Sequence, residues 1–262
     1  MYICPVCSEK LLLSEKSFVC KNRHNFDISA SGYVNLLTGS GKNHGDDAEM
    51  ISARRRFLCR GYYSPLCDAV IEECKKAAPS NLLDAGCGEG YYTKRIKEAL
   101  PGCKVYGFDI SKKAAEKAAK LGGLNISVAS AYHMPYENGC FDCAVNIFSP
   151  LAQNEYLRVL KPGGTLILAV PSPDHLSEIK AAVYDAPHTK EMKDDGLDGF
   201  VLTNKIELKY GMDLDRDSLL DLFAMTPYVH KTSEKDRQKL YEKEKMIVTA
   251  SFTVITYKAQ KF

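Results

Sequence analysis

The chain has 262 residues, of which 45% are hydrophobic and 26% are charged. These are ordinary values for a globular protein and exclude a disordered or collagen-like chain. The 35 basic and 33 acidic residues leave a formal charge of +2, which does not by itself indicate a nucleic-acid partner. No apolar run approaches the roughly 18 residues of a membrane-spanning helix, so we expect no membrane partner. The first residues, MYICPVCSEK, lack the regions of a secretory signal, which predicts a cytoplasmic protein.

Ten cysteines in a chain without an export signal favour reduced thiols or metal ligands over disulfides. Cys4 and Cys7 form a C-x2-C pair, and Cys20 and His24 form a C-x3-H pair. Two close pairs separated by a segment of hairpin length are typical of a tetrahedral zinc site. Because all four ligands would come from the protein, this zinc would be structural. The alternative is a chance cluster of thiols, which requires both spacings to be accidental.

We expect short strands at Leu11–Leu13 and Phe18–Val19, inside a zinc-ribbon-like module that covers residues 1–37. Residues 38–78 are expected to form a linker and a helix, because a segment rich in Gly, Ser, Asn and Asp precedes apolar positions at helical spacing, which end before Pro79. Four arginines lie on this helix: Arg54, Arg55, Arg56 and Arg60. They form either a solvated helix face or a surface for RNA phosphates.

The segment LLDAGCGEGYYT, residues 82–93, is typical of a strand, a glycine-rich loop and the start of a helix. In this layout the bare backbone of the loop approaches a cofactor at the helix N-terminus. The glycines follow a G-x-G-x-G spacing instead of the G-x-G-x-x-G that dinucleotides favour, and an acid precedes them. This tighter form suits a cofactor that has no phosphate and carries an ammonium group, such as S-adenosylmethionine. The residues assigned to this pocket are Asp84, Gly86, Gly88, Glu89 and Gly90.

Further strands place more residues at the same edge of the predicted sheet. CKVYGFDIS contains a strand that ends at Asp109, where an acid can accept both ribose hydroxyls of the cofactor. A third strand leads to Ser130 and Ala131, where a loop can flank the adenine. A fourth strand, FDCAVNIF, is followed by a helix, a turn at Lys161–Gly164 and a fifth strand. The period-two pattern of residues 246–258 predicts an antiparallel strand at the edge of the sheet.

Together, DAGCGEG, the acid at Asp109 and LKPGG resemble class I S-adenosylmethionine-dependent methyltransferases. The whole chain is similar to the RlmA-type 23S ribosomal RNA guanine-N1 methyltransferases. That resemblance rests on the zinc spacing, on GYVNLL, GDDAEM, ARRRFL and GCGEGYYT, and on the late MTP, and it covers nearly the full length. It implies an α/β fold: a Rossmann-like, mostly parallel sheet with an antiparallel edge strand over residues 79–262, preceded by the zinc-ribbon-like module.

The resemblance also implies an activity, namely transfer of the methyl group of S-adenosylmethionine to N1 of a guanine in a 23S ribosomal RNA hairpin by a homodimer. It adds Tyr63 and His175 to the cofactor pocket; alone, these would be interpreted as a helix-face aromatic and a surface or packing histidine. We expect the target base to be extruded beside Asn146–Pro150. No catalytic base is evident, because NIFSPL contains no carboxylate, and neither Asp142 nor His133 is assigned.

Two other functions fit parts of the pattern. A small-molecule methyltransferase would need neither the zinc module nor the arginines. A non-catalytic zinc-ribbon RNA-binding protein with a vestigial fold would not need the intact glycine loop or Asp109, and binding of S-adenosylmethionine separates it from the enzyme. The sequence does not specify which guanine is modified. We expect the zinc module and the cofactor domain to be separate folding units, so that Cys20→Ser loosens the first and spares cofactor affinity.

Overall fold

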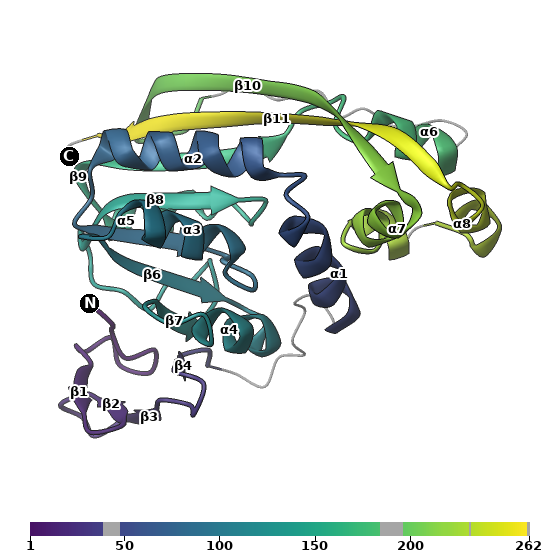
Figure 1. Cartoon of the computed structure of the whole chain (residues 1–262). Helices are drawn as coiled ribbons and strands as arrows, with labels where there is room; N and C mark the ends of the chain where they lie inside the picture. The colour runs from purple at the N-terminus through teal and green to yellow at the C-terminus, as the bar shows by residue number, and fades with distance from the viewer. Residues whose placement is uncertain (39–47, 184–195, 231, 261–262) are drawn as a thin grey trace.

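The computed structural model describes residues 1–38, 48–183, 196–230 and 232–260. Within these residues, a mostly parallel eight-stranded sheet forms the body of the molecule (Figure 1). In spatial order its strands are β10 (Phe200–Asp215), β11 (Lys245–Ala259), β9 (Leu160–Pro171), β8 (Phe141–Ile147), β5 (Asn81–Ala85), β6 (Lys104–Asp109), β7 (Asn125–Val128) and β4 (Tyr33–Asn35). A second sheet in the front module contains β1 (Leu12–Ser14), β2 (Ser17–Val19) and β3 (Asn25–Asp27). The expected linker residues 39–47 lie outside the described ranges.

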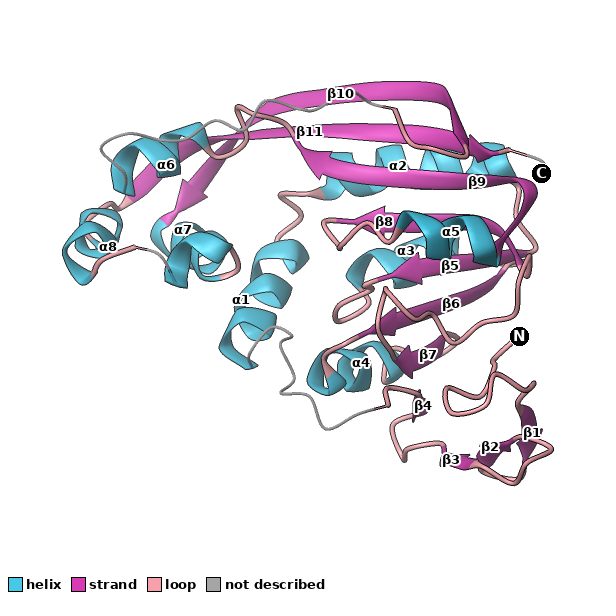
Figure 2. Cartoon of the chain, turned by 180° about the vertical axis from the view of Figure 1, so that it is seen from behind, coloured by secondary structure: helices cyan, strands magenta, loops and turns pink. Residues whose placement is uncertain are grey.

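Helices cover both faces of the large sheet. α2 (Ser64–Ala77) and α3 (Tyr91–Ala99) pack together on one face, and Figure 2 shows α5 (Gln153–Val159) in front of the other. α4 (Lys112–Ala119) packs against β6 and β7. Because both faces are covered, the central strands are nearly continuous apolar runs; all of β8 except Asp142 is buried. The carboxyl ends of the parallel strands meet at one edge, where ligands bind in open α/β sheets.

Two antiparallel strands, not one, complete the sheet at its far side. β11 is antiparallel to β9, as the pattern of residues 246–258 predicts, but it does not lie at the edge because β10 pairs along its other side. β10 is the true edge strand, and most of its residues alternate between exposed and half-buried. At the far end of this long hairpin lie α6 (Ser177–Val183), α7 (Arg216–Ala224) and α8 (Glu234–Tyr241) (Figure 1).

The helix expected before Pro79 is divided into two. α1 (Ala48–Cys59) and α2 are separated by a turn in which Gly61 adopts a left-handed φ of +83°. The turn expected at Lys161–Gly164 belongs to β9 instead, and the register between β8 and β9 shifts beside it. The predicted strands of the front module and the helix starting near Tyr91 are confirmed. No helix in the described ranges is long and apolar enough to cross a membrane.

The front module does not pack as a separate unit. β4, which the sequence assigns to this module, pairs in parallel with β7 and extends the large sheet. Tyr2 stacks on Tyr136 with ring centroids 5.3 Å apart, and the N–H of Ile3 donates to the carbonyl of Pro135 at 3.0 Å. Cys20 is buried in a hydrophobic core that also includes residues of β5 and β6. The expectation of separate folding units is therefore wrong.

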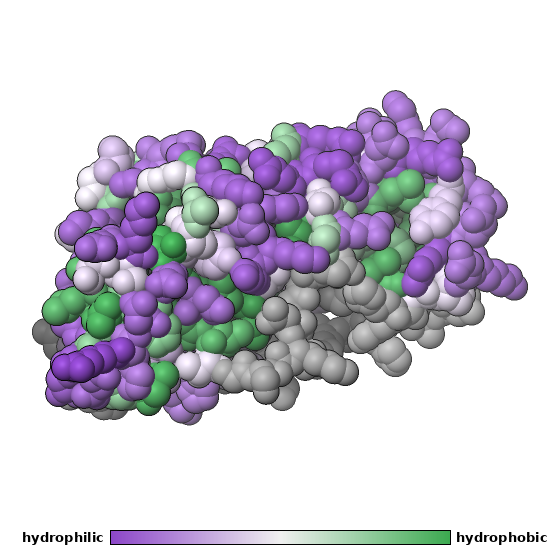
Figure 3. All heavy atoms as spheres, turned by 90° about the horizontal axis from the view of Figure 1, so that it is seen from below, coloured by the Kyte–Doolittle hydropathy of each residue, from purple (hydrophilic) through white to green (hydrophobic). Residues whose placement is uncertain are grey.

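Exposed apolar residues are distributed over several parts of the molecule. Figure 3 shows hydrophobic surface interspersed with hydrophilic residues over one face, not one continuous apolar area. The front module exposes Leu12 and Leu13, whereas the carboxyl edge of the sheet exposes Tyr132, Phe148 and Leu151. The last group matters for function, because it lies where a ligand is expected.

Candidate active site and metal centre

Four ligand atoms meet at one point in the front module. Nδ1 of His24 lies 3.4, 3.3 and 3.4 Å from the Sγ atoms of Cys4, Cys7 and Cys20, respectively. The Sγ atoms of Cys7 and Cys20 are 3.7 Å apart. A tetrahedral zinc with bonds of about 2.3 Å to sulfur and about 2.0–2.1 Å to nitrogen requires S–N distances of about 3.6 Å and S–S distances of about 3.8 Å. The arrangement therefore fits one zinc ion, with Nδ1 as the histidine ligand.

The local backbone explains why these two short motifs converge. Ser8, which follows Cys7, and Arg23, which precedes His24, adopt left-handed φ values of +59° and +63°. Their N–H groups donate to the carbonyls of Cys4 and Cys20 at 2.8 and 2.9 Å, which closes two tight turns. A backbone hydrogen bond from Glu9 lowers the pKa of the Cys7 thiol to about 6. This favours the thiolate, the form that binds zinc.

The glycine loop connects β5 to α3 and is tied to the end of β6. The N–H groups of Gly86 and Cys87 donate to the carbonyl of Phe108, both at 2.9 Å. The N–H of Gly88 donates to Oδ2 of Asp109, also at 2.9 Å. Oδ1 of the same carboxylate accepts from the backbone of Ser111 at 2.8 Å, which orients Asp109 at the carboxyl edge. The structure thus brings the predicted loop and the predicted ribose-binding acid together.

The three glycines have different neighbours. A Cβ on Gly86 would lie 2.2 Å from Oγ of Ser149, and one on Gly90 would lie 3.0 Å from Cβ of Ala118. The packing of the protein itself therefore requires glycine at these two positions. Gly88 has a left-handed φ of +56°, and its Cβ would meet nothing closer than 4.0 Å. This is the part of the loop that a cofactor can approach.

Two carboxyl groups are buried at the loop: that of Asp84 before it and that of Glu89 within it. Asp84 is 2% exposed and accepts a hydrogen bond from the Thr93 hydroxyl at 2.6 Å; burial raises its pKa to about 6. Glu89 is 7% exposed, and burial raises its pKa to about 7 against the opposing charge of Arg55 and Lys117. Oε2 of Glu89 has no hydrogen-bond partner within the described part of the chain. A buried acceptor is normally hydrogen-bonded to a donor. The ammonium group of S-adenosylmethionine would provide such a donor.

The adenine end of the predicted pocket follows β7. Ser130 and Ala131 are half-buried in the loop there, and the Ser130 hydroxyl accepts from the N–H of Tyr132 at 3.2 Å. Ile110, directly after Asp109, is 38% exposed at the same edge. Ile110 is not among the residues predicted from the sequence, although an apolar residue directly after a strand that ends at this edge is a usable signal.

Tyr63 and His175 lie together beyond β8. The Tyr63 hydroxyl is 3.3 Å from Nε2 of His175, and Nδ1 of the same ring accepts from the N–H of Ser251 at 3.2 Å. Because Nδ1 accepts from a backbone donor, the neutral ring carries its proton on Nε2 and donates to Tyr63. Burial, assisted by Lys180, lowers the pKa of His175 to about 3, and burial raises the pKa of Tyr63. Both side chains are therefore neutral at pH 7.

The turn Asn146–Pro150 connects the two halves of this site. Its Ser149 side chain lies against Gly86 of the glycine loop, and the neighbouring Phe148 ring lies 6.5 Å, centroid to centroid, from the ring of Tyr63. The predicted cofactor residues from Asp84 to Ala131 thus line the carboxyl edge on one side of the turn. Tyr63 and His175, predicted from resemblance alone, lie on the other.

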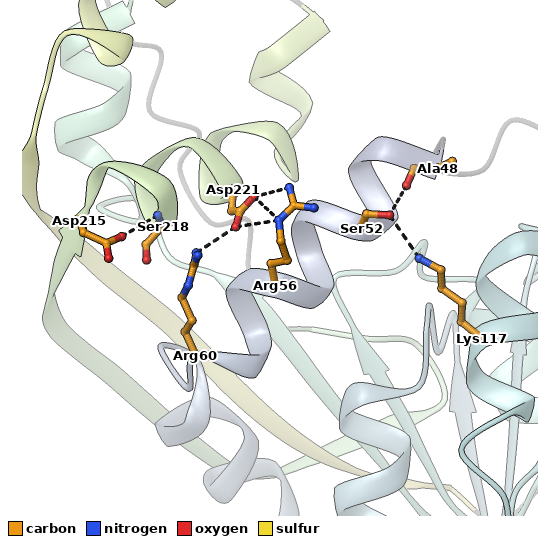
Figure 4. A network of polar contacts seen from close by, with 8 residues as sticks. All are labelled: Ala48, Ser52, Arg56, Arg60, Lys117, Asp215, Ser218 and Asp221. Carbon is orange, nitrogen blue, oxygen red and sulfur yellow. Dashed lines mark hydrogen bonds and ion pairs between the residues drawn. The ribbon is translucent and has the colours of Figure 1, made fainter.

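Arg56 on α1 and Arg60, which directly follows the last residue of α1, form ion pairs within the chain (Figure 4). Nε of Arg56 and Nη1 of Arg60 both lie 2.9 Å from carboxylate oxygens of Asp221 in α7. The Asp221 side chain is only 8% exposed. At the other end of α1, the Ser52 hydroxyl accepts from Lys117 of α4 at 3.4 Å. The interpretation as a purely solvated helix face is therefore wrong for Arg56 and Arg60. Both side chains hold α1 and the turn after it to α7.

Comparison with known proteins identifies the chain's relatives. A zinc-ribbon family model described as "RlmA, N-terminal" matches residues 2–43, and a model described as "Methyltransferase domain" matches residues 83–168. The chain is 32% identical over 235 residues to the 23S rRNA (guanine(748)-N(1))-methyltransferase of Streptomyces fradiae, which covers 86% of this chain and 84% of the relative. The chain belongs to the 23S rRNA (guanine-N1)-methyltransferase family. The predicted family is thus confirmed.

Two further proteins are similar to most of this chain. It is 33% identical over 262 residues to the YxjB protein of Bacillus subtilis (strain 168), which covers 94% of this chain and 92% of the relative. Among solved structures, the YcgJ protein of Bacillus subtilis matches with a TM-score of 0.53 at 17% identity, covering 75% of this chain and 98% of that one. At that identity the likeness concerns the fold alone. The predicted class I methyltransferase fold is confirmed.

Proposed function

We propose that this protein transfers the methyl group of S-adenosylmethionine to N1 of a guanine in a hairpin of 23S ribosomal RNA. The observation that carries this proposal is the glycine loop, in which the open Gly88 adjoins Glu89, whose buried Oε2 has no hydrogen-bond partner among the residues that the structure describes. The same chain holds a Cys/His set with tetrahedral zinc geometry. Its Streptomyces fradiae relative is named for the guanine-N1 reaction on 23S rRNA.

The cofactor residues divide into groups by the part of S-adenosylmethionine that each would hold. Asp109 would accept the ribose hydroxyls, and the residues after β7 would flank the adenine. The acids Asp84 and Glu89 would face the ammonium group, with Tyr63 and His175 nearby. The full set that we propose is Tyr63, Asp84, Gly86, Gly88, Glu89, Gly90, Asp109, Ser130, Ala131 and His175. When bound, the cofactor supplies a methyl group on a sulfonium, a reactive donor whose orientation accounts for much of the rate.

The reaction must also remove the proton from N1 of guanine. N1 takes the methyl group, the electron pair of the broken bond stays on sulfur, and the N1 proton passes to water. His175 is poorly suited as the base, because its pKa is about 3 and the N–H of Ser251 already occupies Nδ1. Asp142 accepts from Ser80, Asn81 and Lys161 at the opposite end of β8, so it has a structural role. We therefore assign catalysis to positioning and name no general base.

The remaining parts of the proposal concern metal and partners. One structural zinc would be held by Cys4, Cys7, Cys20 and His24. Around the site, we propose that the front module and exposed Arg55 contact the RNA backbone. Arg56 and Arg60 would contribute to RNA binding mainly by holding α1 in position against α7. The family resemblance supports a cytoplasmic homodimer.

The decisive experiment is incubation of the purified protein with 23S ribosomal RNA and isotopically labelled S-adenosylmethionine, followed by nuclease digestion and mass mapping. We expect label on one guanine, together with a reverse-transcription stop, because a methyl group on N1 blocks base pairing. Methylation of free small molecules without modification of RNA would favour the small-molecule alternative. Binding of RNA without binding of the cofactor would favour the non-catalytic alternative.

A further inference from the structure

Phe148 is an aromatic residue that the fold holds at the surface in an unfavourable conformation. It follows β8 at the carboxyl edge of the sheet, and the residue is 44% exposed. Its φ of +57° lies in the left-handed region, which a bulky side chain rarely adopts. Such conformations persist where surrounding contacts enforce them, and they gather at functional sites.

The contacts that enforce this turn are on both sides of Phe148. Its N–H donates to the carbonyl of Ala169 in β9 at 3.2 Å. The buried side chain of Asn146 donates to the carbonyl of Pro150 at 3.2 Å and to the Tyr156 hydroxyl at 2.8 Å. The same amide accepts from the N–H of Ser149 at 3.1 Å. Asn146 is thus committed to shaping the turn, and the turn presents the ring of Phe148.

The position of the ring relates it to the proposed cofactor pocket. Its centroid lies 5.6 Å from that of the fully buried Phe252 and 6.5 Å from that of Tyr63. The next residue, Ser149, packs against Gly86 of the glycine loop. One side of the Phe148 ring therefore rests on an aromatic cluster, while the remainder is open beside the site.

A nucleobase extruded from RNA loses its stacking neighbours, and aromatic side chains commonly replace them. The turn NIFSPL has no charged group, and its exposed aromatic ring can supply stacking. A ring stacked on the face of a purine leaves the edge that carries N1 accessible to a methyl donor. We propose that Phe148 is the platform on which the target guanine stacks during methyl transfer. This inference rests on the proposed function and adds a substrate-binding residue to it.

The test compares Phe148→Leu and Phe148→Tyr in steady-state methylation of 23S RNA. Loss of the ring should lower kcat/KM for RNA by about fivefold to 150-fold, the range that corresponds to stacking of one base. Phe148→Tyr keeps an aromatic ring and should retain most of the wild-type kcat/KM for RNA. The dissociation constant for S-adenosylmethionine, measured by calorimetry, should stay the same in both variants. Val201→Ala, which changes a 49%-exposed residue of β10 away from the site, is the control and should behave as wild type.

Phe148→Gly separates a role in function from a role in stability. Glycine adopts this φ without steric penalty, so this variant should unfold at a temperature no lower than Phe148→Leu, yet lose methylation equally. Wild-type activity in Phe148→Leu or Phe148→Gly would overturn this inference and leave the proposed function unchanged. A parallel loss of cofactor affinity would also overturn it, because Phe148 would then belong to the cofactor pocket. Failure of the wild-type protein to methylate RNA would overturn the proposed function itself.

Discussion

Arg56 and Asp221 are 165 residues apart in the sequence and form an ion pair that joins α1 to α7. The turn after α1 is held to the same region, because the Tyr62 hydroxyl donates to Oγ of Ser218 in α7 at 3.1 Å. The next residue is Tyr63, which contacts His175 in the proposed cofactor pocket. The far end of the β10–β11 hairpin therefore positions the segment that carries Tyr63.

Asp221→Ala should destabilise the protein, because two arginines lose their shared carboxylate. We expect a loss of about 1–3 kcal/mol in the free energy of unfolding, since the side chains of Arg56 and Arg60 are 56% and 36% exposed and can be hydrated instead. Denaturant unfolding measures this change. Asp217→Ala, an exposed acid on the same helix, is the matched control. Equal stability of the two variants would show that the ion pairs do not hold α1 to α7.

Cys20→Ser should reduce the zinc content from one ion per chain to a small fraction, as measured by elemental analysis. It should also lower the thermal unfolding midpoint of the whole protein, because Cys20 is buried in a core shared with the large sheet. Cys59→Ser, at an exposed thiol of α1, should change neither quantity. Absence of zinc from wild-type protein purified without chelators would contradict the assignment.

Asp109→Ala should weaken binding of S-adenosylmethionine by about 1–3 kcal/mol, the range for hydrogen bonds to a charged group. Replacement of Gly88 by leucine should weaken binding further, because a side chain would fill the open side of the loop. Titration calorimetry measures both effects, with Asp213→Ala, an exposed acid of β10, as control. Wild-type affinity in both variants would mean that the cofactor binds elsewhere.

The features that the sequence predicts well depend on neighbouring residues. The two cysteine-containing pairs close tight turns within a few positions, and the glycine loop follows from its own spacing between β5 and α3. Asp109 follows from the rule that ligands gather at the carboxyl ends of parallel strands. The choice of Nδ1 in His24 required the three-dimensional arrangement, because either ring nitrogen suits the C-x3-H spacing.

The features that the sequence does not predict depend on partners far along the chain. Nothing near Arg56 indicates that its carboxylate partner lies 165 residues away in α7. The left-handed φ of Phe148 opposes the local preference of an aromatic residue, and it is imposed by Asn146 and by Ala169 of the neighbouring strand. β10 has one half-buried face, so its identity as an edge strand becomes clear only from its pairing with β11.

The affinity for S-adenosylmethionine should rise with pH between about pH 6 and pH 7.5. Burial raises the pKa of Glu89 to about 7 and that of Asp84 to about 6, so both carboxyl groups are partly protonated and neutral at the lower pH. The cofactor has one sulfonium and one ammonium against one carboxylate, and is a net cation. It therefore binds the ionised carboxylates more tightly, and binding releases protons from groups that were protonated in the free protein.

Glu89→Gln tests this linkage, because glutamine has nearly the shape of glutamate and cannot ionise. The variant should bind S-adenosylmethionine more weakly at pH 7.5, and its affinity should vary less with pH than that of the wild type. Calorimetry in two buffers of different ionisation enthalpy should detect proton release in the wild type and less release in the variant. Glu207→Gln, at an exposed position of β10, should retain the wild-type profile. An affinity that falls as pH rises, or an unchanged profile in Glu89→Gln, would place the ammonium group of the cofactor away from this carboxylate.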